Sequence, residues 1–589
     1  MTADAADAGF ARKVLWIWLG LCALSLAVNT RVILDIRFPD PDDLLRLLQV
    51  RDWVSGQSWF DVHQYRINPP DGAAMHWTRL IDPPIAAIIV ALRPLVGQHL
   101  AELAALVIVP LLTLGCGVAL VARFARRMFG TEVAIFACLV LAVSVPVLHQ
   151  LRPLRIDHHG WQIVMALIAL NAAFARNPRV GGTIAGLALA FWLAISIEGL
   201  PLAAATMGLF ALRWLRDWRD AAWLSHGMAA LALASLGFWL IGHRPVELWQ
   251  QYCDVVSGGH LALLLVSAAG CWLATRLAGP RLWQQLAALA GAGLAGLTAL
   301  ILLAPQCAGG DAFAALDPVV REFWYLRVRE GLPIWHQPPS DAVQAVGLPV
   351  LALVALCIWW REAEQAKRGL WIEYAWLVAS ALAVTFMVER ASAVAATFAA
   401  PAAAALVRRW LDQANRNPSP VLRIGIVVAA LATLVPAIPV KAVKSLVAPQ
   451  QVALERRVEQ NAKCELARNL RGVATLPAAT FLSTLDTGPA LLYASNHRIV
   501  ASGHHRSSVA MRDVILTFRG SPQQARAIVT RRRVDYIAFC PGLYEPMTYQ
   551  AQAPDGLMAR LLRGDVPDWL EPVSLEDVNG LKVYRVRPQ

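Results

Sequence analysis

The stretch Arg152-Pro-Leu-Arg155-Ile-Asp157-His158-His159-Gly160-Trp161 is polar, and an apolar run lies on each side of it. Charged groups beside a bilayer are costly and need a partner or a task. An aspartate and two histidines next to two arginines indicate a site for a cation and an anionic ligand. A second acidic cluster, Asp40-Pro41-Asp42-Asp43, follows the first apolar run of the chain. Together the two clusters predict chemistry at one face of a membrane.

The overall composition is that of a membrane protein. Of the 589 residues, 57% are hydrophobic and 16% are charged, whereas soluble domains carry about 25% charged residues. The net charge of +12 could indicate a nucleic-acid partner. The arginines lie in short loops between apolar runs, however, and this pattern favours positive-inside membrane topology over nucleic-acid binding.

Apolar runs of spanning length recur along the chain and predict a polytopic α-helical membrane protein with about 13 transmembrane helices. The runs are 14–34, 100–122, 131–149, 159–175, 181–196, 198–212, 223–242, 259–275, 283–304, 345–360, 371–388, 391–407 and 423–440.

Basic residues predict the orientation of these helices. They cluster in alternate loops, which positive-inside topology places in the cytoplasm. The N-terminus is then cytoplasmic, and the C-terminal region lies outside. The clusters are Arg123, Arg126 and Arg127; Arg176 and Arg179; Arg213, Arg216 and Arg219; Arg276 and Arg281; Arg361, Lys367 and Arg368; and Arg408, Arg409, Arg416 and Arg423.

Two domains are predicted: a transmembrane domain, 1–444, and a soluble outer domain, 445–589. The outer loops 35–99 and 305–344 are too long for simple connectors. The first of them contains a predicted amphipathic helix, Asp42–Val54, and a short apolar segment at 84–97 that we expect to lie at the membrane interface.

The outer domain is predicted to be a small α/β unit. Val534–Phe539 and Leu581–Arg585 have the alternating pattern of strands. Segments near 452–470 and 521–531 have the pattern of helices. His504-His505-Arg506 could bind a metal or a substrate, but we favour a surface loop.

The cysteines fall into two groups. Seven of the nine lie in or beside apolar runs and are predicted core residues. Cys464 and Cys540 lie in the polar C-terminal part, where an extracytoplasmic location would make a disulfide between them plausible.

Four short motifs, taken in order, resemble those of the oligosaccharyltransferase catalytic subunit, within the GT-C class of membrane glycosyltransferases. Phe38–Arg46, with Arg51–Gly56 following, looks like the family's first outer-loop motif, and Asp42 takes its acidic position. Asp157-His158-His159 looks like the second motif, Asp-x-Asp or Asp-x-Glu. The resemblance implies 13 transmembrane helices (about the number of apolar runs) and a C-terminal domain outside the cytoplasm.

The other two motifs lie further along the chain. Val328–Pro333 is similar to the family's Ser-x-Ser-Glu-x-x-Pro stretch, which makes Glu330 the catalytic glutamate of a mobile outer loop. Met387–Arg390 looks like the segment that supplies an arginine to the donor diphosphate.

The chain departs from the family at two points. The Trp-Trp-Asp motif that reads the acceptor sequon is absent, and its nearest counterpart is Ser483-Thr-Leu-Asp486-Thr-Gly488. This departure puts recognition of a sequon asparagine in doubt. His159 replaces the usual second carboxylate, which makes the metal site unusual although imidazole also binds divalent transition metals.

The resemblance implies a role for each candidate residue. Transfer from a lipid-phosphate sugar needs a cation at the leaving phosphate and a carboxylate at the acceptor. Asp42, Asp157, His159 and Glu330 would hold a divalent metal, Mg²⁺ or Mn²⁺. Asp42 and Glu330 would also be catalytic. Arg390 would bind the donor phosphate, with Arg152 and Arg155 as further candidates.

Each of these residues also has a purely structural interpretation. Asp157 and Asp42 could cap the helices that follow them. Glu330 could be a solvated loop charge paired with Arg327 or Arg329. Arg390 could extend to the membrane interface or pair with Glu389. The sequence does not decide whether His76, Trp77 and Arg79 line the acceptor cavity or only brace the loop.

The predicted function is a membrane glycosyltransferase that moves a sugar or oligosaccharide from a polyprenyl-phosphate or polyprenyl-diphosphate donor. Its acceptor at the outer face is a lipid, a polysaccharide or a protein hydroxyl rather than a sequon asparagine. A flippase or transporter of a lipid-linked glycan is the alternative, although the runs carry few charges near the midplane. A non-catalytic glycan-binding relative is a third class. The predicted location is the bacterial inner membrane.

Overall fold

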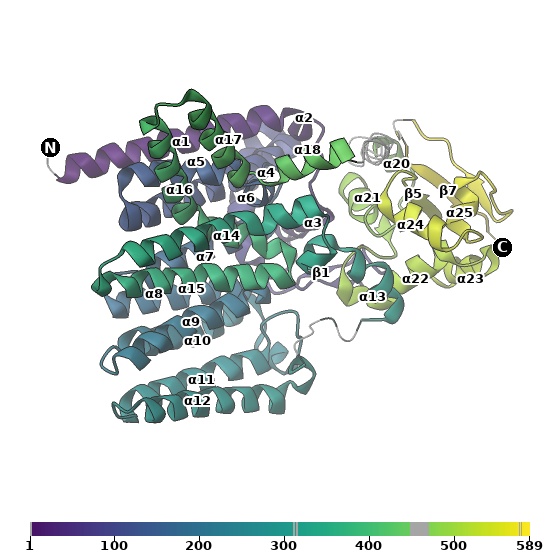
Figure 1. The fold of residues 1–589 in the computed structure, drawn as a ribbon. Coiled ribbons are helices and arrows are strands. Elements are labelled where there is room, and N and C mark those ends of the chain that lie inside the picture. Colours follow the sequence, from purple (N-terminus) through teal and green to yellow (C-terminus); the bar gives the residue numbers. More distant parts are fainter. Residues whose placement is uncertain are drawn as a thin grey trace.

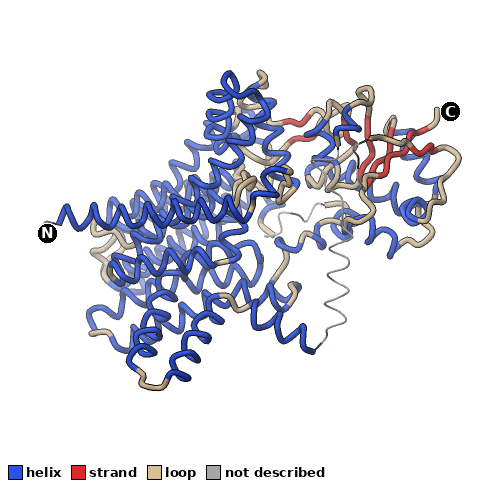
Figure 2. Tube along the Cα trace, turned by 90° about the horizontal axis from the view of Figure 1, so that it is seen from above, coloured by secondary structure: helices blue, strands red, loops and turns tan. Residues whose placement is uncertain are grey.

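The computed structural model describes residues 3–309, 313, 316–447, 470–576, 578 and 580–588. Long helices, packed side by side, form one part of the protein (Figure 1). The strands of a single five-stranded sheet gather at the opposite end from the N-terminus, close to the C-terminus (Figure 2). The chain is thus a helical membrane domain with a small α/β domain at one end.

Each of the thirteen apolar runs falls on a helix or on a bent pair of helices. Among the described residues, nine helices are long and apolar enough to cross a membrane, or eleven if each bent pair is one span. The predicted multi-pass membrane protein is therefore confirmed, whereas the count of thirteen spans stays a prediction. The helices on which the thirteen runs fall, of which α7 and α9 are too short to be counted among the eleven, are α1 (Ala3–Val28), α4 (Asp82–Phe129), α5 (Thr131–Val143) with α6 (Val145–Leu151), α7 (His159–Ala173), α8 (Pro178–Ile195), α9 (Leu200–Arg216), α10 (Ala222–Gly242), α11 (Gly258–Leu277), α12 (Leu282–Leu303), α14 (Pro339–Glu362), α15 (Gln365–Met387), α16 (Ser392–Arg416), and α17 (Pro420–Leu434) with α18 (Ala437–Val447).

The short apolar segment at 84–97 is helical and leads directly into the second predicted span. Both belong to α4, which has one break in its helical backbone, at Gly97. The φ of Gly97 is 80°, in a region that residues with a Cβ rarely adopt. Glycine therefore lets a helix of the outer loop turn into a spanning helix without an intervening loop.

Ion pairs join the predicted cytoplasmic loops to one another. Arg126 contacts Asp7 (2.6 Å), which lies near the N-terminus at the left of Figure 1. Arg409 contacts Glu362 (2.8 Å), and Arg408 contacts Glu132 (3.2 Å). These contacts place several of the basic loops at the same end of the bundle.

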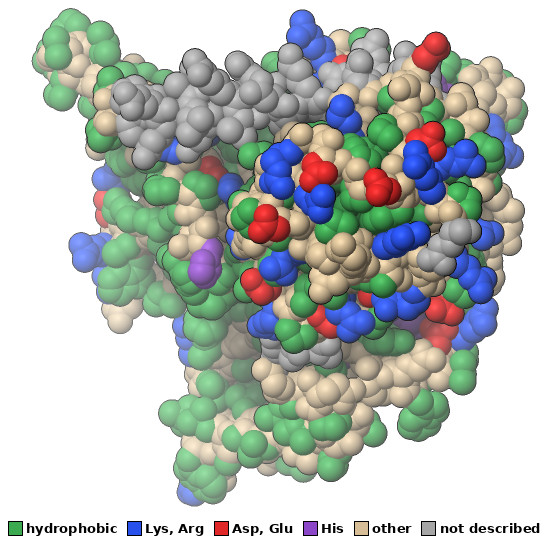
Figure 3. Space-filling model, turned by 90° about the vertical axis from the view of Figure 1, so that its right-hand side faces the viewer, with side chains coloured by type: hydrophobic (Ala, Val, Ile, Leu, Met, Phe, Trp, Pro, Cys, Tyr) green, Lys and Arg blue, Asp and Glu red, His purple; other side chains and the backbone are tan. Residues whose placement is uncertain are grey.

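The α/β domain has the strand order β4-β3-β5-β7-β6, in which β3 pairs in parallel with β4 and β5 while β7 is antiparallel to β5 and β6. The predicted strands are β5 and β7, and the predicted helix 521–531 is α23; the predicted helix near 452–470 lies outside the described residues. Charged side chains of both signs gather on the face of this domain (Figure 3), as expected of a surface in water. The elements are β3 (Thr480–Ser483), β4 (Arg498–Ile499), β5 (Tyr536–Phe539), β6 (Leu570–Pro572), β7 (Lys582–Val586), α20 (Arg471–Ala474), α21 (Gly488–Ala494), α22 (Ser508–Arg519), α23 (Pro522–Arg531), α24 (Tyr544–Gln552) and α25 (Leu557–Leu562).

The first outer loop joins the two parts. Its amphipathic helix is α3 (Pro41–Val54), and it also holds the small antiparallel pair β1 (His63–Gln64) and β2 (Ala73–Ala74). The backbone of this loop bonds to the sheet edge, since Asn68 N–H donates to the Ile499 carbonyl and Ile499 N–H to the Arg66 carbonyl. Apolar residues of α3 and of the sheet share one core. The α/β domain is therefore attached through the loop that carries Asp42.

The second long outer loop is built from short helices that bring Glu330 to the domain junction. They are η4 (Pro305–Cys307), α13 (Pro318–Phe323), η5 (Tyr325–Arg327), η6 (Arg329–Gly331) and η7 (Ile334–His336). Residues of α13 share a core with the α/β domain.

Of the seven cysteines predicted to be core residues, only Cys138 and Cys271 are buried, whereas Cys116 and Cys357 are exposed. Cys253 and Cys307 form a disulfide rather than serving as core residues. Both lie outside the long apolar helices, in the α10–α11 connection and in η4. Their proximity to an apolar run in the sequence therefore did not predict burial in the helical core. Cys540 is buried. Cys464 lies outside the described residues, and the Cys464–Cys540 disulfide stays a prediction.

A buried ion pair fixes α3 against the start of α4. Arg46 Nη1 lies 3.0 Å from Asp82 Oδ1, and both side chains are almost fully buried. Gln49 donates to the other oxygen of Asp82 at 3.0 Å. The helix that carries Asp42 is thereby held at a fixed position relative to the membrane domain.

We expect Asp82→Ala to destabilise the protein, because it leaves Arg46 buried without its carboxylate. Removing one partner of a buried pair costs about 3–5 kcal/mol. The melting temperature of the purified protein in detergent measures this effect. Glu571→Gln breaks the exposed contact between Glu571 and Arg587 (3.8 Å) and serves as the control. Equal melting temperatures for the two variants would contradict the assigned importance of Asp82.

Candidate functional site

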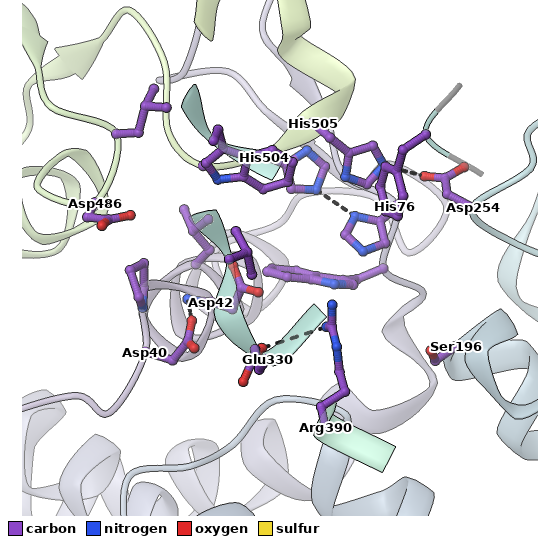
Figure 4. Close-up of a pocket in the computed structure, with 18 of the residues that line it drawn as sticks. Asp40, Asp42, His76, Ser196, Asp254, Glu330, Arg390, Asp486, His504 and His505 are labelled. Atoms are coloured by element: carbon purple, nitrogen blue, oxygen red, sulfur yellow. Dashed lines mark hydrogen bonds and ion pairs between the residues drawn. The ribbon is translucent and has the colours of Figure 1, made fainter. Parts of the chain in front are cut away.

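A cavity of about 390 Å³ lies where the membrane domain, both outer loops and the α/β domain meet. The predicted residues Asp42, Glu330 and Arg390 all line it. Figure 4 shows Asp40, Asp42 and Glu330 near one another, with Arg390 beside Glu330. Residues from segments hundreds of positions apart thus converge on one polar space.

The start of α3 presents Asp42 to this cavity. Asp40, not Asp42, is the N-cap, since its Oδ1 accepts the Asp42 N–H at 2.9 Å. The acidic cluster does cap α3, but through Asp40 rather than through Asp42. Burial, followed by the neighbouring charges of Asp40, Asp157 and Glu330, raises the pKa of Asp42 well above its ordinary value.

Arg155 is a buried cation surrounded by carboxylates. Its side chain is 1% exposed. Nη1 lies 3.1 Å from Asp40 and 3.3 Å from Asp43, and Nη2 lies 3.2 Å from Asp157 and 3.9 Å from Glu330. Although burial opposes the charged form, these carboxylates raise the pKa of Arg155 above its ordinary value. The guanidinium therefore connects both predicted acidic clusters to the Glu330 loop.

Asp43 is the residue that positions the Asp157 motif. Its Oδ1 accepts the backbone N–H groups of Ile156 and Asp157, at 2.8 and 3.0 Å. The Asp43 side chain is fully buried. An aspartate that the sequence presented only as part of an acidic run thus holds the backbone just before α7.

Asp157 and His159 lie behind the cavity wall. The N-cap of α7 is His158 and not Asp157, although Asp157 Oδ1 accepts the N–H of His159, the first residue of the helix, at 3.0 Å. Asp157 Oδ2 is buried, forms the ion pair with Arg155 Nη2 at 3.2 Å and lies 3.6 Å from His159 Nε2. Burial raises the pKa of Asp157, but Arg155 and His159 outweigh burial and hold it below its ordinary value. An ionised carboxylate oxygen next to an imidazole nitrogen is a donor pair that a divalent cation accepts.

Glu198 is a further carboxylate at this site that the motifs did not indicate. It belongs to the 3-10 turn η2 (Ile197–Gly199) after α8. It forms a candidate metal-binding group with His158 and His159, because each of the three residues offers one ligand atom and these atoms lie within 4.8 Å of one another. In the sequence, Glu198 is marked only by being a charged residue at the end of an apolar run.

Arg390 lies between two carboxylates. Its Nη1 is 3.4 Å from Glu198 and 3.7 Å from Glu330. The Glu389 N–H also donates to the Leu332 carbonyl at 3.1 Å, which holds the two segments together. Arg152, by contrast, does not line this cavity, and its Nη2 lies 3.2 Å from His149.

Four residues with metal-binding or acid–base chemistry line another part of the cavity: His76, Asp254, His504 and His505. The expectation that His504–Arg506 forms a surface loop is wrong for His504, which is 2% exposed. Packing of the α/β domain against the outer loops buries it, and no local pattern predicts that packing. His76, which the sequence left undecided, does line the cavity.

Asp486 and Glu545 lie on the α/β side of the cavity. Glu545 accepts the N–H groups of Leu485 (2.9 Å) and Asp486 (3.2 Å), as well as the Tyr549 hydroxyl (2.7 Å). Burial and then Asp486 raise the pKa of Glu545 to about 8. Burial and then Asp40 raise the pKa of Asp486 to about 6. Glu545 thus fixes the loop that presents Asp486.

A second cavity, of about 270 Å³, shares Glu198 and Arg390 with the first. Apolar side chains of α8, α9, α15 and α16 make up much of its lining, among them Trp192, Leu202 and Val394. The polar cavity is therefore adjacent to an apolar one at Arg390.

No protein-family model and no curated protein matches the chain, but solved structures match its fold. The archaeal oligosaccharyltransferase AglB from Archaeoglobus fulgidus, in complex with an inhibitory peptide and a dolichol-phosphate, has a TM-score of 0.64 and 14% identity over 95% of this chain and 72% of that chain. The oligosaccharyltransferase of the same organism matches in its apo form (TM-score 0.66, 14% identity, 95% and 73% covered) and with Zn and sulfate (TM-score 0.57, 14% identity, 97% and 73% covered). The predicted oligosaccharyltransferase-like GT-C fold is confirmed.

We expect Glu545→Gln to become more stable relative to the wild type as the pH rises. The folded-state pKa of Glu545 is raised to about 8, so its contribution to stability is complete at low pH and is lost as the pH rises through that value. A glutamine stays neutral and escapes this loss. Melting temperatures between pH 5 and 9 measure the difference, and a difference that does not change with pH would contradict the buried acid pair.

Proposed function

We propose that this protein is a membrane glycosyltransferase that transfers a sugar or oligosaccharide from a polyprenyl-phosphate or polyprenyl-diphosphate donor to a hydroxyl acceptor. The observation that carries the proposal is the polar cavity at the domain junction, where Asp42, Glu330 and Arg390 meet beside an apolar cavity. A lipid-linked sugar needs both environments at once.

The apolar cavity is suited to the lipid end of the donor. Its boundary with the polar cavity is marked by Arg390, whose guanidinium would pair with phosphate oxygens. The related AglB structure was solved with a dolichol-phosphate, which is a lipid of this kind. Arg155 already contacts four carboxylates and Arg152 lies away from the cavity, so Arg390 is the stronger candidate for the donor phosphate.

Asp42 is our candidate base. In the proposed step the bond between the sugar's anomeric carbon and the phosphate oxygen breaks, and a new bond forms from that carbon to the acceptor oxygen. The acceptor proton passes to Asp42, and the lipid leaves as its phosphate or diphosphate. The raised pKa of Asp42 brings its proton affinity closer to what a general base needs near neutral pH.

Asp42, Asp157, His159 and Glu330 would hold the divalent cation, with His158 and Glu198 adjacent to them. Such a cation would offset the charge of the leaving phosphate. The position of Asp157 Oδ2, 3.6 Å from His159 Nε2, supports this assignment. The neighbouring carboxylates also repel one another, and a cation would relieve that repulsion.

The acceptor is proposed to be a hydroxyl of a lipid, a polysaccharide or a protein. The sequence lacks the Trp-Trp-Asp motif that reads a sequon. Its counterpart, Asp486, lines the cavity opposite Arg390 (Figure 4). A carboxylate at this place would accept a hydrogen bond from a hydroxyl.

The polar face is proposed to lie outside the cytoplasm of a bacterial-type inner membrane. The basic loops lie at the other end of the bundle, as positive-inside topology requires. The Cys253–Cys307 disulfide, on the cavity side, suits an oxidising compartment.

Asp42→Asn, Asp157→Asn and Glu330→Gln should each abolish transfer while the protein stays folded. Each change keeps the size of the side chain but removes a carboxylate that binds the cation or the acceptor proton. The measurement is complementation of a gene deletion, followed by mass spectrometry of envelope glycolipids, polysaccharides and glycoproteins. Wild type alone should restore the lost species. Full restoration by all three variants would overturn the site assignment, and impaired movement of a lipid-linked precursor between leaflets would instead indicate a flippase.

The pH dependence of transfer should follow the ionisation of Asp42. Activity should fall as the pH drops through its raised pKa, because the protonated carboxyl can accept no proton. Asp40→Asn keeps a good helix N-cap but removes the neighbouring charge that raises the pKa of Asp42 most. It should therefore move the acidic limb of kcat/KM to lower pH. An unmoved limb would exclude Asp42 as the titrating group.

A further inference from the structure

A second group of metal-ligating side chains lies on the far side of the cavity from Asp42. His76, Asp254 and His505 each offer one ligand atom, and these atoms lie within 4.8 Å of one another. They come from the first outer loop, the α10–α11 connection and the α/β domain. Figure 4 shows the three side chains together with His504 at one edge of the cavity.

The polar contacts around these residues match those of metal ligands. His76 Nδ1 bonds to His504 Nε2 at 2.7 Å, which leaves Nε2 of His76 for an ion. Arg506 contacts Asp254 through both oxygens, Nε to Oδ2 at 2.9 Å and Nη2 to Oδ1 at 3.0 Å. Histidine and carboxylate ligands are characteristically oriented by such partners.

Two further features surround the cluster. His504 is 2% exposed, yet its Nδ1 has no hydrogen-bond partner among the described residues. The residue before Asp254 is Cys253, whose disulfide to Cys307 ties this connection to the end of α12. The segment that supplies the carboxylate is thus fixed covalently before any ion binds.

We propose that His76, Asp254 and His505 bind a Zn²⁺-type ion at the junction of the two domains. Two imidazoles and one carboxylate are a ligand set that zinc accepts, with a fourth position left open. The site is separate from the cation site at Asp157, because Trp77 lies between them, in ring contact with both His76 (5.2 Å) and His158 (6.5 Å). The ion would bridge three segments that no continuous secondary structure joins.

Binding would change the tautomer of His505. Its Nε2 lies 2.7 Å from Asp254 Oδ2, a distance at which the two atoms share a hydrogen. The ion would take the place of this hydrogen, which would move to Nδ1 of the same ring, so that His505 ligates as a neutral imidazole. Arg506 would remain on Asp254.

The test is the metal content of the purified full-length protein after chelation and reloading with Zn²⁺ or Co²⁺. The wild type should bind one more ion per chain than Asp254→Asn or His505→Ala. Asp157→Asn should keep the ion at His76, and His504→Ala should weaken it about 10–100-fold. His63→Ala, a histidine of the same outer loop outside the cluster, should bind as the wild type does.

The outcomes distinguish this site from the proposed catalytic one. Metal content unchanged by Asp254→Asn and His505→Ala would overturn the inference, whereas content unchanged by Asp157→Asn would overturn only the cation site of the proposed function. If either cluster variant fails to fold, Zn²⁺ anomalous scattering from wild-type crystals decides instead. A peak between His76, Asp254 and His505 supports the site, and no peak there in zinc-loaded crystals overturns it.

Discussion

The arrangement of the polar face depends on one buried cation, the guanidinium of Arg155. Carboxylates are costly to bury, and several of them at one place repel one another. Arg155 contacts Asp40, Asp43, Asp157 and Glu330, which come from three separate segments of the chain. It thereby allows a dense acidic cluster to exist beside a bilayer. Without this charge neither acidic motif could lie so close to the other.

The same cluster explains how the two domains are held around a cavity. Asp43 accepts backbone hydrogens of the Asp157 motif, while the helix that carries Asp43 packs against the sheet of the α/β domain. Backbone hydrogen bonds from residues 66–68 to the sheet edge add a second attachment. The cavity is therefore built by polar contacts on the membrane side and by an apolar core on the outer side. Apolar space next to Arg390 completes an environment suited to a lipid-linked phosphate.

The two candidate cation sites differ in their surroundings and would serve different ends. Around Asp157 the ligands are crowded by other carboxylates, and Arg390 lies within reach of the same space. Around Asp254 there is one carboxylate, three histidines and an arginine that is already paired. The first environment is suited to neutralising a phosphate. The second is suited to fastening the α/β domain to the loops beneath it.

Much of the fold was determined by the sequence alone. The length of the apolar runs reflects the thickness of the bilayer, and the basic loops follow the positive-inside rule. The helical runs, the amphipathic helix after Asp40 and the strands β5 and β7 follow from such local patterns, and the order of four motifs indicated the fold and brought out Asp42, Glu330 and Arg390. Tertiary structure alone decided the rest. Asp43, Glu198, Asp254 and His504 acquire their surroundings from segments distant in sequence, and Cys253 finds Cys307 across 54 positions. Burial and pairing depend on which distant segments contact one another, and no local sequence pattern predicts those contacts.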